Sequence, residues 1–230
     1  MNSFFASIGR VLASRIQTSD LNLNSISKQP LFQFKLTELD QSFVLEQLLS
    51  LKANKATGLN KISARLLKIS AHEIAPSVVK LLNLSIRTGQ FPKLWKCTKI
   101  TALFKSGDRT NVSNYRPISI LPTLCKILER AVHLQLYQHL ITNNFLSNKQ
   151  FGFRKGFSTT TVLTSFADEV LLNMMEQGKL CGAVFIDLTK AFDTVDHQIM
   201  LCKLSETGLS ETALHWFRSY LTGRQQRNFQ

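Results

Sequence analysis

Apolar residues recur every three or four positions through most of the chain, a spacing that predicts a largely helical protein. The periodic stretches predict helices over residues 43–51, 62–69, 74–86, 122–141, 158–177, 196–206 and 211–222. Ser158 is a favoured N-cap residue, and Gly89 and Gly178 are placed to end the third and the fifth of these helices.

Three shorter stretches have the pattern of β-strands instead. Residues 97–105 and 114–121 alternate polar and apolar positions on either side of the turn signal KSGD, which predicts a β-hairpin. Pro117 confines the second strand to a sheet edge or a bulge. Residues 180–187 are almost continuously apolar and predict a buried strand that ends at Asp187. Together with the helices, these strands indicate an α/β protein.

The composition is that of an ordinary globular chain, with 44% hydrophobic and 19% charged residues. No apolar run approaches the roughly 20 residues of a membrane span, so no membrane partner is expected. Residues 4–16 predict an amphipathic helix rather than a transit peptide, and no secretory signal is present. The four cysteines are widely spaced without a C-x-x-C pair, which favours core residues in a reducing intracellular compartment, nucleus or cytoplasm.

The net charge of +13 is the first feature that points to function. The whole excess lies in residues 51–160, which contain 18 basic and 3 acidic residues. Such a charge density favours a polyanionic partner, and a nucleic-acid backbone is the commonest one. A solvated, lysine-rich surface is the alternative interpretation.

Asp187 is the first candidate for chemistry. A buried strand that ends in aspartate places a carboxylate at the rim of a sheet, where a cation that prefers oxygen ligands, such as Mg²⁺, can be held. A strand-end cap is the alternative interpretation. Asp193 and Asp196 are assigned to the start of the following helix, where carboxylates interact with free backbone N–H groups. Asp168 and Glu169 are assigned to the solvent face of the helix at 158–177.

Two groups of cations are also candidates. Lys105 and Arg116 lie on the two arms of the hairpin, so its folding brings both charges toward one anion. A charged sheet edge that discourages aggregation is the alternative. In the loop QFGFRKGFS, Phe153 stands beside Arg154 and Lys155, a combination that suits stacked bases and phosphates. A buried loop with aromatic plugs is the alternative interpretation there.

Five motifs occur in a fixed order: KATGLNKIS, KSGDRTNVSNYRPISIL, QFGFRKGFSTT, VFIDLTKAFDTVDH and WFRSYLTGRQQ. Together they resemble the reverse transcriptase domain of non-LTR (LINE-like, jockey-type) retrotransposons, from about residue 35 to the C-terminus. The resemblance implies a right-hand polymerase with a linker at 1–34, a fingers-like region at 35–178 and the start of the palm at 179–230. The implied fold is helix-rich α/β, with a fingers β-hairpin and a palm sheet truncated before the Tyr/Phe-x-Asp-Asp hairpin and the thumb.

The resemblance also implies roles for single residues. Asp187 is the implied catalytic metal ligand, assisted by the backbone carbonyl of Leu188, for one of two Mg²⁺ ions. Phe192 is the implied aromatic steric gate under the incoming sugar, and a core phenylalanine is the alternative. Lys105 and Arg116 are the implied grip on the triphosphate of the dNTP. The residues implied to lie against the RNA template and the DNA primer are Gln150, Gly152, Phe153 and Arg154.

The sequence departs from the family pattern in one respect that bears on activity. Residues 1–230 contain no Tyr/Phe-x-Asp-Asp motif, the second catalytic aspartate motif, and two-metal phosphoryl transfer needs several carboxylates. We therefore expect RNA-directed DNA polymerase (nucleotidyltransferase) activity in a complete polymerase and none from this fragment alone. The alternatives are a non-catalytic nucleic-acid-binding remnant and a decayed element without a selected function. The sequence predicts no oligomeric state.

Overall fold

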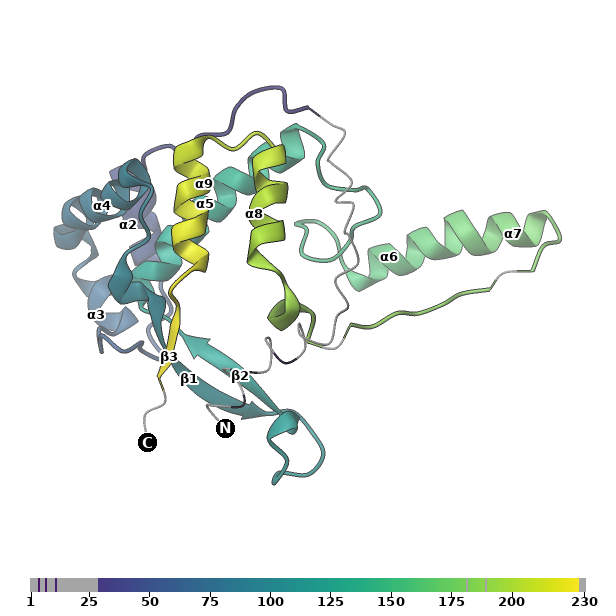
Figure 1. Cartoon of the computed structure of the whole chain (residues 1–230), viewed down its shortest axis with the longest axis horizontal. Helices are drawn as coiled ribbons and strands as arrows, with labels where there is room; N and C mark the ends of the chain where they lie inside the picture. Colours follow the sequence, from purple (N-terminus) through teal and green to yellow (C-terminus); the bar gives the residue numbers. More distant parts are fainter. Residues whose placement is uncertain are drawn as a thin grey trace.

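The computed structural model describes Phe4, Ser7, Val11 and residues 29–180, 182–188 and 190–227. These residues form a body of packed helices from which two extensions project, the β1–β2 hairpin and an arm that carries α6 and α7 (Figure 1). The amphipathic helix expected at 4–16 falls largely outside the described residues. No helix in the described part of the chain combines the length and the apolar character needed to cross a membrane.

Helices occupy all seven stretches that the apolar periodicity predicts. The α-helices are α2 (Gln41–Leu49), α3 (Ala64–Ile69), α4 (Ala71–Thr88), α5 (Thr123–Thr142), α6 (Thr159–Phe166), α7 (Asn173–Glu176), α8 (His197–Glu206) and α9 (Glu211–Leu221). Short 3₁₀ turns form η1 (Lys93–Lys96), η2 (Val112–Asn114) and η4 (Ala191–Thr194). A π-helical stretch, η3 (Ala167–Leu172), joins α6 to α7, so the predicted helix at 158–177 is one continuous helical run.

The ends of two helices follow the signals read from the sequence. The Ser158 side chain accepts a hydrogen bond from the Thr161 backbone N–H, and the Thr161 hydroxyl accepts one from the Ser158 N–H, which is a complete capping box. At the end of α4, Gly89 has a φ of 62°, a left-handed conformation that glycine adopts without a steric cost. The Gln90 N–H then donates to the Ser85 carbonyl at 3.1 Å and closes the helix.

In the part of the chain that the structure describes, the sheet has three strands in the order β2–β1–β3, with bounds β1 (Cys97–Phe104), β2 (Tyr115–Ile120) and β3 (Gln225–Arg227). The predicted hairpin is confirmed, because β1 and β2 pair antiparallel, while β3 pairs parallel to β1. Pro117 lies on the edge strand β2, as its missing N–H requires. The connection differs from the tight turn expected at KSGD, since residues 105–114 form a longer loop that contains η2.

The prediction of a buried strand at residues 180–187 is wrong for the residues that the structure describes there. Residues 182–188 carry no strand, and every one of their side chains is exposed, with Phe185 at 91%. They run back along the arm from the end of α7 (Figure 1). A strand needs a neighbour to receive its backbone hydrogen bonds, and these residues find none within the described chain. Apolar character alone therefore did not determine the structure of this segment.

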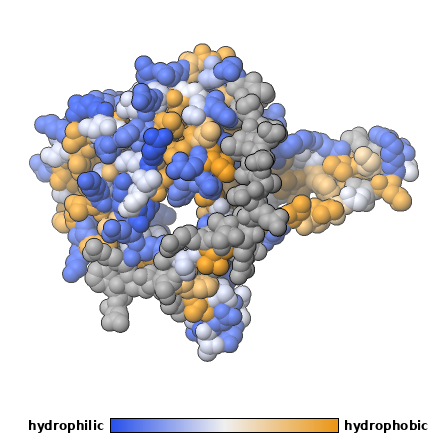
Figure 2. Space-filling model, viewed as in Figure 1, coloured by the Kyte–Doolittle hydropathy of each residue, from blue (hydrophilic) through white to orange (hydrophobic). Residues whose placement is uncertain are grey.

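The hydrophobic core lies between α2, α4, α5 and α9. Its largest fully buried side chains are Trp216, Phe91, Leu48, Leu82, Leu128, Val44 and Cys125. Cys125 is a core residue as predicted, whereas Cys97 is half-buried and Cys202 is exposed, so that prediction is wrong for Cys202. Apolar side chains lie on the surface of the projecting arm in Figure 2, and this exposure contrasts with the packed helices of the body.

Gly58 lies where the loop after α2 meets the chain that enters α5, and we expect its replacement by alanine to destabilise the fold. A Cβ at this position would lie 2.8 Å from the Pro122 nitrogen and 2.9 Å from the Leu121 carbonyl carbon. Both are backbone atoms, so one segment must move, at a cost of about 1–3 kcal/mol. Urea denaturation measures the change. Gly152→Ala is the matched control, because no atom of the described residues lies within 4 Å of its Cβ position. Equal midpoints for the two variants would contradict the prediction.

Candidate nucleotide and nucleic-acid site

The hairpin places Lys105 and Arg116 on one face. Leu103 pairs directly with Arg116, and the Lys105 backbone N–H donates to the Asn114 carbonyl at 2.8 Å, which continues the ladder by one step. Because side chains alternate along a strand, Leu103, Lys105 and Arg116 point to the same side of the ribbon. Both cations are exposed, and no carboxylate among the described residues forms an ion pair with either. The face therefore presents two uncompensated positive charges.

The loop at the tip of the hairpin is held by its own contacts, which the sequence did not predict. The Tyr115 hydroxyl donates to the Arg109 carbonyl at 2.9 Å, and the Arg109 guanidinium lies 4.9 Å from the centre of the Phe104 ring. The Thr110 hydroxyl and its backbone N–H both donate to the Asp108 carboxylate, and these hydrogen bonds lower the pKa of Asp108. Lys105 and Arg116 lie at the base of this loop.

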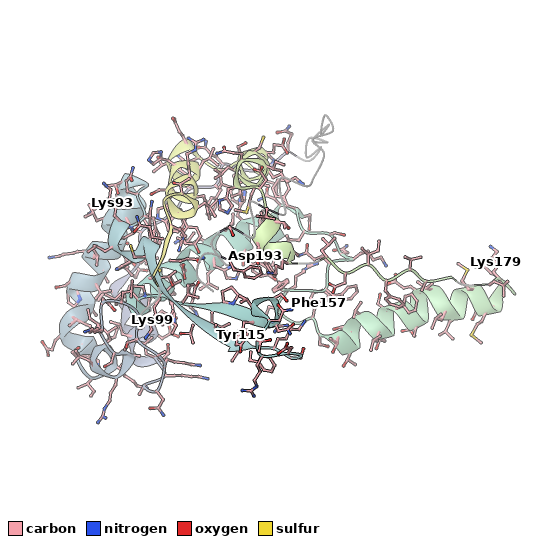
Figure 3. The ribbon with its side chains drawn as sticks, turned by 60° about the horizontal axis from the view of Figure 1, so that its bottom comes forward. Lys93, Lys99, Tyr115, Phe157, Lys179 and Asp193 are labelled. Atoms are coloured by element: carbon pink, nitrogen blue, oxygen red, sulfur yellow. The ribbon has the colours of Figure 1, made fainter. Side chains whose placement is uncertain are left out.

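A second group of cations lies at the other end of β1. Lys93 and Lys96 belong to η1, immediately before the strand, and Arg224 precedes β3. Burial, followed by the positive charges of Arg224 and Lys93, lowers the pKa of Lys96. Arg224 Nη2 lies 4.0 Å from Glu129 Oε1, which is a long ion pair. Lys93 and Lys99 appear on the body side of the hairpin in Figure 3. The sheet thus carries positive charge near both ends of β1.

The loop between α5 and α6 contains the four residues that the sequence assigned to nucleic acid, and it is internally braced. Arg154 Nη1 donates to the Ser147 carbonyl at 2.8 Å and to the Gln150 carbonyl at 3.4 Å. The same guanidinium lies over the Phe157 ring at 4.7 Å. Arg154 therefore organises its own loop, while Gly152, Phe153 and Lys155 stay exposed. No atom of the described residues lies close enough to Gly152 to require glycine there.

Two polar contacts attach this loop to its neighbours. The Lys155 backbone N–H donates to the Tyr137 hydroxyl of α5 at 3.2 Å. Lys149 pairs with Glu169 on the arm, and hydrogen bonds from Lys149 and Ser165 lower the pKa of Glu169. In Figure 3, Phe157 and Asp193 lie where the arm joins the body, and Lys179 lies at its far tip. The loop is consequently fixed at the junction of arm and body.

Asp187 and Leu188 lie on the exposed segment that returns along the arm. Both side chains are exposed, with Leu188 at 70%. Among the described residues, no group of three or more His, Cys, Asp or Glu side chains could hold a metal ion. Mg²⁺ is bound through several oxygen ligands, and Asp187 offers one carboxylate. The residues present therefore do not fit a two-ion Mg²⁺ site by themselves.

Phe192 lies in η4 and contacts the loop described above. Its ring centre is 5.7 Å from that of Phe153, and the two rings are perpendicular. Asp196 is the N-cap of α8, because its carboxylate accepts hydrogen bonds from Gln198 N at 2.7 Å and Ile199 N at 3.1 Å. The assignment of Asp196 to a helix start is thus confirmed. Phe153 and Phe192 are the two predicted site residues from different motifs that the described structure brings into contact.

Comparison with known proteins gives a consistent result. The family model described as "Reverse transcriptase (RNA-dependent DNA polymerase)" matches residues 105–230. The chain is 28% identical over 190 residues, 82% of its length, to a "Probable RNA-directed DNA polymerase from transposon X-element" of Drosophila melanogaster. It is 30% identical over 182 residues, 79% of its length, to the "RNA-directed DNA polymerase from mobile element jockey" of Drosophila funebris.

These relatives are much longer proteins. The matched region covers 21% of the X-element protein and 20% of the jockey protein of Drosophila funebris. A "Probable RNA-directed DNA polymerase from transposon BS" of Drosophila melanogaster is 30% identical to this chain over 71% of the chain's length. The matched region covers 18% of that protein. The chain therefore spans about a fifth of the length of the curated relatives that it matches.

Proposed function

This chain belongs to the reverse transcriptase (RNA-dependent DNA polymerase) family, and from that membership we propose that it is the fingers and the beginning of the palm of an RNA-directed DNA polymerase. The names of its relatives support a jockey-like, non-LTR retrotransposon as its source. In this proposal residues 35–178 are fingers-like, residues 179–230 begin the palm, and residues 1–34 are a linker. The substrates are an RNA template, a DNA primer and dNTPs.

The observation that carries the proposal is the pairing register of the hairpin. It holds Lys105 and Arg116 on one exposed face, and no carboxylate of the described chain neutralises either charge. A triphosphate placed against this face receives the planar fork of Arg116, which can bind two phosphate oxygens, and the point charge of Lys105. The braced tip loop keeps the hairpin in this geometry, so little order is lost when the anion binds.

The template contact is assigned to the loop before α6. Gly152, Phe153 and Lys155 are exposed there, and exposed aromatic rings beside cations suit a single-stranded nucleic acid. Gln150 and Arg154 contribute mainly by holding the loop in shape. Phe192 lies beside this loop, which is compatible with a ring that packs under the sugar of the incoming nucleotide. A ring in that position excludes the 2′-hydroxyl of a ribonucleotide.

Asp187 is proposed as one carboxylate ligand of a Mg²⁺ site, with the Leu188 carbonyl beside it. Asp187 would hold such an ion, and the chemistry that the ion would supply is stabilisation of negative charge on the reacting phosphate. Among the described residues, Asp187 belongs to no group of three or more His, Cys, Asp or Glu side chains that could hold a metal ion, so we assign no nucleotidyl-transfer step to this chain. That same observation favours a second candidate, a non-catalytic nucleic-acid-binding protein. Template-directed synthesis by residues 1–230, abolished by Asp187→Ala, would contradict the second candidate and our expectation of inactivity.

Salt-dependent binding tests the proposal. We expect the chain to bind an RNA–DNA hybrid, because its middle segment has 18 basic and 3 acidic residues. The logarithm of the binding constant should fall linearly with the logarithm of the salt concentration, with a slope of about −4 or steeper, which corresponds to about four or more phosphates. Fluorescence anisotropy with a labelled hybrid measures it. No binding at low salt, or a slope near zero, would contradict the proposed function.

A further inference from the structure

Phe153 and Phe192 come from two separate segments and meet on the surface. Phe153 is 87% exposed and Phe192 is 79% exposed, although their ring centres are only 5.7 Å apart. The interplanar angle of 89° is the edge-to-face arrangement that aromatic pairs prefer. Two large apolar rings with this exposure leave most of their area in water. A ligand that covers them would remove that area from water.

The backbone next to both rings is strained. Phe153 has a φ of 62°, and Lys190, two residues before Phe192, has a φ of 52°. Residues other than glycine rarely adopt this left-handed conformation, and where they do, the surrounding structure holds them in it. Four such residues occur in the described chain, Lys61, Asn144, Phe153 and Lys190, and two of the four flank this contact.

The segments that carry Phe153 and Phe192 are held in place by different contacts. The loop that carries Phe153 is braced by Arg154 and attached to α5 through the Tyr137 hydroxyl. The 3₁₀ turn that carries Phe192 follows residues 182–188, which have no strand partner in the described chain. On the Phe192 side, the Asp193 N–H donates to the Lys190 carbonyl at 2.8 Å, and the Lys190 ammonium lies 4.7 Å from the centre of the Phe4 ring. The loop that carries Phe153 is held by hydrogen bonds to the Ser147 and Gln150 carbonyls and to the Tyr137 hydroxyl of α5, so we take Phe153 as the anchor of the pair.

We propose that Phe153 is a positioning residue that fixes the ring of Phe192, so that the loop before α6 helps to set the sugar selectivity of the nucleotide site. This inference rests on the proposed function, because it takes Phe192 as the ring under the incoming sugar. A ring held edge-to-face has one position relative to a 2′-hydroxyl, whereas a ring without that contact can rotate away. An aromatic pair of this kind corresponds to about a 2- to 10-fold change in an equilibrium constant.

A single fluorine label at Phe192 tests the inference. We would incorporate 4-fluorophenylalanine at Phe192 and record its ¹⁹F resonance in the otherwise native chain, in Phe153→Ala and in Phe153→Tyr. Phe32→Ala is the matched control, since Phe32 is an exposed ring on the segment before α2. Each protein is then titrated with dCTP and with CTP in the presence of Mg²⁺, and the ¹⁹F shift gives both dissociation constants.

We expect Phe153→Ala to move the ¹⁹F resonance and to lower the preference for dCTP over CTP by about 2- to 10-fold. Phe153→Tyr, which keeps the ring, should retain most of the preference for dCTP, and Phe32→Ala should leave both quantities unchanged. A native chain that prefers dCTP, with neither quantity altered by Phe153→Ala, would overturn the positioning role alone. A native chain whose Phe192 resonance responds to neither nucleotide would overturn the proposed nucleotide site, and the positioning role with it.

Discussion

Replacing Trp216 with alanine is expected to lower the free energy of unfolding by about 3–5 kcal/mol. Trp216 is 1% exposed and lies where α9 packs against α4. Its ring stacks on Tyr220 at 5.3 Å and meets Phe91 edge-to-face at 5.6 Å. Its indole N–H donates to the Ser85 hydroxyl at 3.0 Å. The truncation removes all of these contacts and leaves a cavity, and the Ser85 hydroxyl keeps only its own hydrogen bond to the Gln90 carbonyl.

Urea denaturation measures this loss against two further variants. Trp216→Phe keeps an aromatic ring but removes the hydrogen bond to Ser85, and we expect it to lose about 1–3 kcal/mol. Leu94→Ala is the control, because Leu94 is 86% exposed and its truncation should change the free energy of unfolding by less than about 0.5 kcal/mol. A Trp216→Ala midpoint equal to that of Leu94→Ala would show that α9 does not pack on the core as described.

Removal of the hairpin cations is expected to have the largest effect on ligand binding. Arg116→Ala should weaken the binding of a fluorescent dNTP by about 10- to 100-fold, because a charge-assisted hydrogen bond contributes about 1.5–3 kcal/mol. Arg116→Lys should fall between the native chain and Arg116→Ala, since lysine keeps the charge but lacks the planar fork. Lys105→Ala should weaken binding less than Arg116→Ala does, because it removes a point charge alone.

The matched control for these variants is Lys179→Ala. Lys179 is an exposed cation at the far tip of the arm, away from the hairpin (Figure 3). Its removal takes one positive charge from the chain but should leave dNTP binding unchanged at moderate salt, where distant charges are screened. If Lys179→Ala and Arg116→Ala weaken binding equally, the effect is one of net charge, and the proposed triphosphate contact is wrong.

Much of the local structure could be predicted from the sequence because its causes are local. The periodicity of apolar residues located the helices. Ser158 and Gly89 cap helices through hydrogen bonds and backbone conformation that involve only residues close to them in the sequence. The alternation across residues 97–121 likewise predicted the hairpin. A hairpin at these residues is enough to predict that Lys105 and Arg116 approach each other. That both side chains lie on the same face follows only from the pairing register, which the structure gives.

The rest depends on partners that are distant in sequence. Residues 182–188 are apolar enough for a buried strand, but a strand forms only where another strand receives its hydrogen bonds. The bracing contacts of Arg154 could not be predicted for a related reason, because the sequence shows a cation without showing the carbonyl oxygens of Ser147 and Gln150 that it binds. The contact between Phe153 and Phe192 joins two loops, and no local pattern predicts it.

Photo-crosslinking tests most directly whether the hairpin and the loop before α6 form the nucleic-acid interface. An RNA–DNA hybrid with a photoreactive base at the first unpaired template position is irradiated with the native chain and a dNTP, and the crosslinked peptides are identified by mass spectrometry. We predict crosslinks within residues 97–120 and 147–157. Crosslinks confined to α3 and α4, at exposed cations such as Lys68 and Lys80, would contradict this placement of the template.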